Sequence, residues 1–137
     1  MNDYETAQHL WKKWTEMWNG KPELARDLAS PGFALHLPTP GNVDPTKVTT
    51  PDEVVAWVAA SIARFDQITF RYEAGPFVDT VAGIVAGPWS AEIVAGGKTS
   101  FVCGMDTIGF KDGKLTEYWT LSKESDAVDR WMQRLVP

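Results

Sequence analysis

Two side chains in the sequence are suited to proton transfer, the carboxyl group of Asp106 and the imidazole of His36. Asp106 lies in the segment GMDTIGFKDGKLTEYW, where Asp112 and Gly113 predict a two-residue hairpin turn between two strands. His36 lies in FALHLP, a short predicted strand that ends before a proline-rich loop. Histidine exchanges protons near neutral pH, and a carboxyl group does so when burial raises its pKa. These residues suggest general acid and base catalysis.

The predicted hairpin sets the pairing between its two strands. If Lys111 faces Lys114 across the turn, then Asp106 faces Trp119. Glu117 is expected on the same face as Asp106, because side chains alternate along a strand. That face is otherwise apolar, so both carboxylates are expected on the core side of the sheet.

A second predicted turn, at Gly96 and Gly97, sets the pairing with the preceding strand. It places Gly104 opposite Trp89, so the Trp89 ring is expected on the face that carries Asp106. Burial beside Trp89 and Trp119 would disfavour the charged carboxylate and raise the pKa of Asp106. The sequence therefore predicts a carboxyl group tuned for proton transfer near neutral pH.

Each candidate also has a structural interpretation, which the sequence leaves open. Asp106 could bond to backbone groups, or face solvent after a shift in register, because burying an unpaired charge is costly. His36 could be a structural histidine at the end of its strand. Alternatively it projects into the same cavity as Asp106, because strand alternation separates it from its apolar neighbours Leu35 and Leu37.

The chain contains seven tryptophans, more than a core of this size needs. Large rigid rings either fill a core or line a pocket for flat apolar molecules, and both interpretations remain open here. The candidate substrate-binding residues are the tryptophans expected near Asp106 or on inner helix faces, with one carboxylate: Trp14, Trp18, Trp57, Trp89, Trp119 and Glu117.

Composition narrows the class of protein. The 137 residues suggest one domain, and a net charge of −5 argues against nucleic acid as a partner. No signal peptide or membrane-spanning apolar run is evident, so a cytoplasmic protein without membrane contact is expected. The single Cys103, with the separated His9 and His36, offers no metal-ligand set, and no nucleotide motif occurs. No metal and no cofactor are therefore expected.

Hydrophobic periodicity predicts three helices in the first half of the chain, at residues 2–20, 22–29 and 50–64. Strands are predicted at residues 33–38, 67–75, 77–87 and 88–98, ahead of the hairpin that carries Asp106. A last helix is predicted around residues 127–135. This order predicts an α+β fold, in which helices cover one face of a curved antiparallel sheet.

The segments WNGKPELARDL, FALHLPTPG and GMDTIGFKDGKLTEYW resemble the SnoaL-like polyketide cyclases of the nuclear transport factor 2 superfamily. The resemblance extends from about residue 7 to residue 121. It implies that residues 1–137 form one cone-shaped domain, with three N-terminal helices over the concave face of the sheet. In such cyclases an aspartate on the long strand before the DGK turn is the general acid and base for an intramolecular aldol closure, and Asp106 matches that place.

Ketosteroid isomerases of the same superfamily use an aspartate at the similar place, in its protonated form, to donate a hydrogen bond to an oxyanion. Either role is therefore implied for Asp106. The base aspartate of those isomerases has no counterpart, because Leu37 stands there beside His36. The Arg-x-Asp element of the epoxide hydrolases is also missing. Classical isomerase and epoxide hydrolase activities are thus disfavoured.

The leading hypothesis is a small cofactor-independent enzyme that acts on a hydrophobic carbonyl compound such as a polyketide, by cyclisation, isomerisation or dehydration. The alternative is a non-catalytic module of the same fold that binds small hydrophobic ligands or dimerises. A homodimer is expected through the outer face of the sheet, to which the predicted register assigns five residues: Cys103, Met105, Thr107, Tyr118 and Thr120.

Overall fold

The computed structural model describes residues 1–37, 43–72 and 74–123, so the helix predicted around residues 127–135 lies outside the described part. The helical elements are α1 (Asp3–Trp18), the 3₁₀ turn η1 (Pro22–Leu24), α2 (Ala25–Leu28), the 3₁₀ turn η2 (Pro45–Lys47) and α3 (Pro51–Ala63). The strands are β1 (Ala29–His36), β2 (Gln67–Tyr72), β3 (Phe77–Asp79), β4 (Ile84–Ala95), β5 (Lys98–Lys111) and β6 (Lys114–Lys123).

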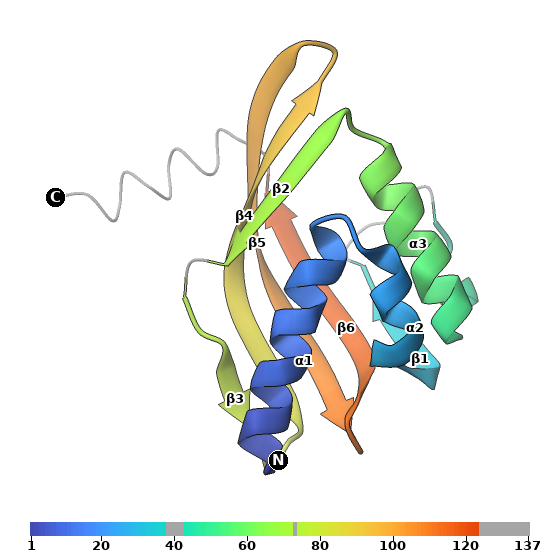
Figure 1. Ribbon diagram of the computed structural model, residues 1–137, viewed down its shortest axis with the longest axis vertical. Coiled ribbons are helices and arrows are strands. Elements are labelled where there is room, and N and C mark those ends of the chain that lie inside the picture. Colours follow the sequence, from blue (N-terminus) through green and yellow to red (C-terminus); the bar gives the residue numbers. More distant parts are fainter. Residues whose placement is uncertain (38–42, 73, 124–137) are drawn as a thin grey trace, which may run out of the picture.

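The strands form one sheet in the order β1-β6-β5-β4-β2, and β3 pairs with β4 beside β2. The three helices lie on one side of this curved sheet, as Figure 1 shows, and the α+β prediction is confirmed. One pairing differs from the prediction, because β1 lies parallel to β6. The chain leaves β1, crosses through α3 to β2 at the opposite end of the strand order, and returns through β4 and β5 to β6. The connection between β1 and β6 is therefore long, as parallel pairing requires.

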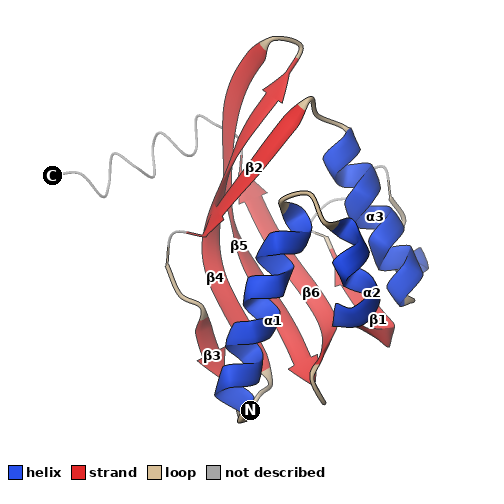
Figure 2. Cartoon of the chain, viewed as in Figure 1, coloured by secondary structure: helices blue, strands red, loops and turns tan. Residues whose placement is uncertain are grey.

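Two observed element boundaries differ from the predicted ones. The second helix ends at Leu28, and β1 begins at once, earlier than the predicted start at residue 33. The segment 77–98 forms the short β3 and then the long β4, which continues through Pro88 (Figure 2). On one edge of β4, β2 pairs from Trp89 onward and β3 pairs as far as Ala86. Pro88 lies between these two segments, so among the described residues it pairs only with Met105 of β5. Within the described part of the chain that edge of β4 is therefore open at Pro88, and a position with an open edge tolerates proline in a strand.

Helix α1 is held at both ends by asparagine side chains. The Asn2 side chain caps the first turn, because it accepts a hydrogen bond from the Glu5 N–H at 2.8 Å. At the other end Asn19 bonds to both backbone groups of Phe70 in β2, at 2.8 and 3.1 Å. The inner stripe of the helix is buried against the sheet: Ala7, Leu10, Trp11, Trp14, Met17 and Trp18. The two Asn19 hydrogen bonds thus fix the C-terminal end of α1, and with it Trp18, against β2.

The β5–β6 hairpin contains a β-bulge that the sequence analysis missed. Phe110 faces Leu115 as predicted, but Gly109 faces Glu117, so Thr116 is an extra residue on β6. A Cβ atom on Gly109 would lie 2.8 Å from the Thr116 Oγ1, and the absence of a side chain there makes room for the bulge.

One extra residue reverses which face each later side chain of β6 occupies. Asp106 therefore faces Thr120, not Trp119, and Tyr118 is buried on the inner face at 5 % exposure. The predicted inward positions of Glu117 and Trp119 are wrong, as are the predicted outward positions of Tyr118 and Thr120. The pairing of Gly104 with Trp89 across β5 and β4 is confirmed.

Gly87 of β4 faces Asp106 and lies beneath α1. A Cβ atom there would come within 2.9 Å of the Trp11 ring and 3.2 Å of the Ala74 carbonyl oxygen. We expect Gly87→Ala to lower the free energy of unfolding by about 1–3 kcal/mol, because overpacking a core displaces its neighbours. Denaturant titration measures the change.

The control is a double-mutant cycle with Trp11→Phe, whose smaller ring leaves space above Gly87. Adding Gly87→Ala to Trp11→Phe should cost clearly less than adding it to the native chain. An equal cost in both backgrounds would mean that the helix does not press on the sheet at this point.

Candidate active site

The carboxyl group of Asp106 is the buried polar group around which the site is built. Asp106 lies in β5 and is only 2 % exposed, between Gly87 of β4 and Thr120 of β6. The expectation that this residue lies on the core side of the sheet is confirmed. A buried carboxylate needs hydrogen-bond donors, because desolvation disfavours its charge.

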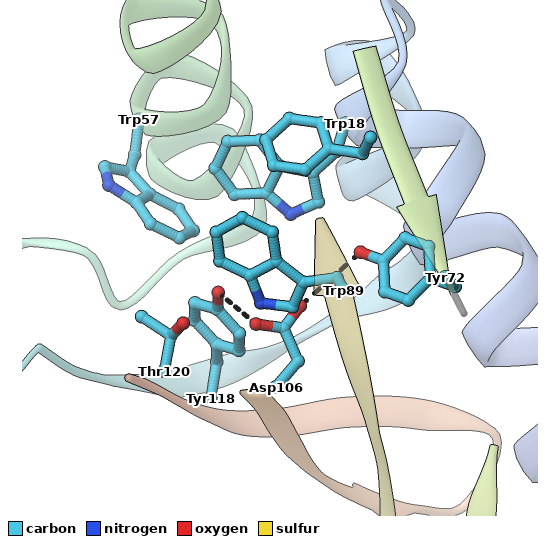
Figure 3. A pocket seen from close by; sticks show the side chains of 8 residues that line it. Trp18, Trp57, Tyr72, Trp89, Asp106, Tyr118 and Thr120 are labelled. Carbon is cyan, nitrogen blue, oxygen red and sulfur yellow. Dashed lines mark hydrogen bonds between the residues drawn. The ribbon is translucent and has the colours of Figure 1, made fainter. Parts of the chain in front are cut away.

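Three donors from three different elements meet this carboxyl group. Trp14 Nε1 of α1 donates to Oδ2 at 3.1 Å, and Tyr118 Oη of β6 donates to Oδ1 at 2.8 Å. Tyr72 Oη of β2 donates to Oδ2 at a longer 3.4 Å. Figure 3 shows the two tyrosines approaching the carboxyl group from opposite sides. Asp106 therefore ties the helix and three strands together.

Burial and hydrogen bonding act on the pKa of Asp106 in opposite directions. Burial raises it above the usual carboxyl value and is the larger effect, while the bonds from Trp14 and Tyr118 lower it. Burial also holds the pKa values of Tyr72 and Tyr118 well above 10, and the nearby Asp106 charge adds to this. Both tyrosines therefore stay protonated at neutral pH and remain donors.

The carboxyl group keeps room for a further hydrogen. Two carboxylate oxygens offer about four acceptor positions. Among the described residues Oδ2 accepts from Trp14 and Tyr72, whereas Oδ1 accepts only from Tyr118. The remaining position on Oδ1 can receive a proton from a molecule in the adjoining cavity.

That cavity has a volume of about 170 Å³ and a mostly aromatic lining. It is lined by Trp18, Trp57, Phe70, Tyr72, Trp89, Asp106, Tyr118 and Thr120 (Figure 3). Two ring pairs of this lining, Trp18 with Trp57 and Phe70 with Trp89, pack edge to face, an arrangement that aromatic pairs prefer. Trp18 lies 5.2 Å from Trp57 at an interplanar angle of 88°, and Phe70 lies 5.5 Å from Trp89. The helices α1 and α3 thus supply one wall, and the sheet supplies the other.

Three buried polar atoms near this cavity have no hydrogen-bond partner in the described part of the chain: Trp18 Nε1, Trp89 Nε1 and Thr120 Oγ1. All three belong to residues that line the cavity. An unsatisfied buried donor typically costs about 1–3 kcal/mol, so such groups are uncommon without a purpose. Their grouping around one cavity indicates a place where a bound molecule supplies acceptors.

His36 does not share this cavity. It pairs with Trp119 on the parallel β1–β6 ladder, on the face of the sheet opposite to Asp106. Its Nε2 lies 3.2 Å from the Glu117 carboxylate, and its ring stacks on Trp119 at 4.7 Å and 10°. The prediction that His36 and Asp106 face one cavity is wrong, and the bulge explains why Glu117 and Trp119 are on the outer side with His36.

The structure brings together part of the predicted set. Trp18, Trp57 and Trp89 line the cavity with Asp106. Trp14 donates a hydrogen bond to Asp106 but does not line the cavity. The sequence analysis missed four lining residues: Phe70, Tyr72, Tyr118 and Thr120. Strand alternation in β2 puts Phe70 and Tyr72 on one face, and this signal could have found them. Only knowledge of the bulge could have placed the other two.

Within residues 1–37, 43–72 and 74–123 no three metal-binding side chains come together. No helix of this described part is long and apolar enough to span a bilayer.

Comparison with known proteins finds similarity in structure only. No family model and no curated protein matches the chain. A candidate polyketide cyclase from Acidithiobacillus ferrooxidans superposes with a TM-score of 0.72 and 20 % identity, over 93 % of this chain and 95 % of that one. IdmH, a candidate polyketide cyclase from Streptomyces antibioticus, gives 0.67 and 21 %, over 95 % and 99 %.

A candidate SnoaL-like polyketide cyclase from Jannaschia gives a TM-score of 0.69 at 13 % identity, over 97 % of this chain and 94 % of that one. Identities this low establish the fold and not the reaction. The protein therefore has the cone-shaped fold of the SnoaL-like polyketide cyclases, as the resemblance in its sequence implied.

The hydrogen-bond network predicts how the pKa of Asp106 responds to substitution. Tyr118→Phe removes the 2.8 Å bond to Oδ1, which favours the ionised carboxylate, so the pKa of Asp106 should rise further. A pH titration of the Asp106 carboxyl carbon by NMR measures this. Tyr4→Phe, on the exposed start of α1, is the matched control and should leave the titration unchanged. An unchanged or lower pKa in Tyr118→Phe would contradict the network.

Proposed function

We propose that the protein is a small enzyme that transfers protons on a hydrophobic carbonyl compound, with Asp106 as the acid and base. The observation that supports this most is a buried carboxyl group with raised pKa on the wall of an aromatic cavity. A carboxylate in that setting is a stronger base than an exposed one, and its working range is closer to neutral pH. The structural neighbours described as candidate polyketide cyclases support the same class of chemistry.

The first step would be common to cyclisation, isomerisation and dehydration. Asp106 takes a proton from the carbon next to a carbonyl group, and the electron pair of that C–H bond moves into the enolate. In an intramolecular aldol closure the enolate carbon bonds to a second carbonyl carbon, and Asp106 returns its proton to the resulting alkoxide. In isomerisation the proton returns to a different carbon.

This chemistry sets what the site must provide. Proton removal next to a carbonyl needs a base and donors for the enolate oxygen, so we propose that no metal or organic cofactor takes part. The cavity of about 170 Å³ is close in size to a cavity that encloses one benzene ring. The reacting ring would be enclosed, and the rest of a larger substrate would extend through the mouth of the cavity.

A non-catalytic ligand-binding module remains the second candidate. One observation favours it, because Asp106 already accepts three hydrogen bonds from the protein, as a purely structural carboxylate would. The two candidates differ in whether the bound molecule exchanges a proton with Asp106. Ligand binding alone does not distinguish them.

Exchange of the methyl protons of acetophenone for deuterium, followed by NMR in D₂O, tests the base directly. We expect the native protein to accelerate the exchange and Asp106→Asn to reduce that acceleration by about 10² to 10⁴-fold. Because the base must be ionised, the exchange rate should fall as pH drops through the pKa of Asp106. Burial raises this pKa, so the fall should occur at higher pH than for an ordinary aspartate.

Asp27→Asn, which removes an exposed carboxylate of α2, is the control and should leave exchange unchanged. A native protein that binds acetophenone without accelerating exchange would support the binding module. If Asp106→Asn loses stability but keeps its exchange rate per folded molecule, Asp106 is structural.

We also propose that the outer face of the sheet is a homodimer interface. The corrected register removes Tyr118 and Thr120 from this face and adds Trp119 to Cys103, Met105 and Thr107. Met105 is 41 % exposed and Trp119 is 37 % exposed, on neighbouring strands that no helix of the described part covers (Figure 1). Apolar side chains gathered on an open sheet face suit a symmetric contact with a second copy.

Met105→Lys should shift the protein toward the monomer in sedimentation at micromolar concentration, because it places a charge in an apolar contact. Tyr4→Lys, at a similarly exposed aromatic residue of α1, is the control and should not change the state. A native protein that sediments as a monomer would refute the dimer.

A further inference from the structure

The unpaired donors of the cavity come from three separate elements. Trp18 closes α1, Trp89 lies in the middle of β4, and Thr120 lies in β6 opposite Asp106. The Trp18 and Trp89 side chains are 8 % and 9 % exposed, and within the described residues neither indole N–H has an acceptor. Both rings face the cavity in Figure 3. Because the donors come from α1, β4 and β6, no single local packing defect explains all three.

The three donors occupy two positions relative to Asp106. Trp89 and Thr120 lie near enough to favour its ionised form, although neither reaches hydrogen-bond geometry with it. Trp18 is not among the donors that act on Asp106. Its ring packs instead against Trp57 at 5.2 Å and Phe70 at 5.5 Å. One position is therefore beside the carboxyl group, and the other is at the helix wall.

The type of donor determines the type of ligand. An indole N–H can donate a hydrogen bond but cannot accept one, so only an acceptor atom satisfies it. In an aromatic cavity of this size, the acceptors would be oxygen atoms attached to a flat ring. A site with fixed buried donors discriminates strongly against a ligand that lacks the matching acceptors, because the donors then stay unpaired.

We propose that the cavity is a binding site for an oxygenated ring, in which Trp89 and Thr120 bind the oxygen beside Asp106 and Trp18 binds a second oxygen. The ligand class is a flat ring system with at least two acceptor oxygens, and not a hydrocarbon. For the first oxygen this rests on the proposed function. As Asp106 removes the proton, charge develops on that oxygen, where Trp89 and Thr120 would stabilise it.

Two pairs of probes differ only in an acceptor oxygen. Acetophenone and α-methylstyrene share a shape, with C=O replaced by C=CH₂. The second pair tests a second oxygen. 4-Methoxyacetophenone has an ether oxygen where 4-ethylacetophenone has a CH₂ group. Calorimetry gives the dissociation constants, and NMR of ¹⁵N-labelled tryptophan follows each indole N–H. We expect acetophenone, but not α-methylstyrene, to move the Trp89 indole proton downfield.

Three variants remove one donor each: Thr120→Val, Trp89→Phe and Trp18→Phe. Thr120→Val and Trp89→Phe should each reduce the preference for acetophenone over α-methylstyrene by up to about tenfold, the usual effect of one lost hydrogen bond. Trp18→Phe should reduce the preference for 4-methoxyacetophenone over 4-ethylacetophenone by a similar factor. Using the ratio within a pair cancels the loss of ring contact, which affects both probes alike.

Trp57→Phe is the matched control, because Trp57 lines the same cavity but its indole nitrogen is not a buried unpaired donor. Equal indole shifts with both members of a pair, or ratios unchanged in every donor variant, would overturn the inference. So would a loss of preference in Trp57→Phe as large as in Trp89→Phe. A native protein that prefers acetophenone but does not exchange its methyl protons would uphold the oxygen site and refute the proposed proton transfer.

Discussion

The buried carboxyl group of Asp106 is the constraint on which the arrangement of the fold depends. Its hydrogen bonds join β5 to α1 through Trp14, to β6 through Tyr118 and to β2 through Tyr72. Hydrogen bonds to a charged group contribute about 1.5–3 kcal/mol each, and losing one leaves a buried charge less compensated. The depth of α1 over the sheet is therefore coupled to the state of this carboxyl group.

Two opposing effects act on the pKa of Asp106. Its donors favour the charged form, whereas its burial favours the neutral form, and burial is the stronger effect. Tyr72 and Tyr118 stay protonated at neutral pH, so Asp106 is the member of this network whose protonation can change. The unpaired Trp18 and Trp89 donors add a stability cost near the same cavity, and residues that carry such costs are often functional.

The bulge at Thr116 separates the two faces of the sheet into different chemical surfaces. It directs Tyr118 and Thr120 toward Asp106 and leaves His36, Glu117 and Trp119 together outside. Without the extra residue the inner face would carry a second carboxylate and lose its phenol donor. The position of one backbone irregularity thus decides which residues can take part in chemistry and which are available for association.

The sequence by itself determined the helices, most strands, both hairpin turns and the inward position of Asp106, because caps, turn residues and alternation are local signals. Its six candidate binding residues include Trp18, Trp57 and Trp89, which line the cavity. Only the tertiary structure decided the face of every residue after Thr116, the parallel pairing of β1 and the contact of Trp14 with Asp106. A bulge depends on packing across the sheet, here on the space at Gly109, and contacts between distant elements leave no periodic trace in the sequence.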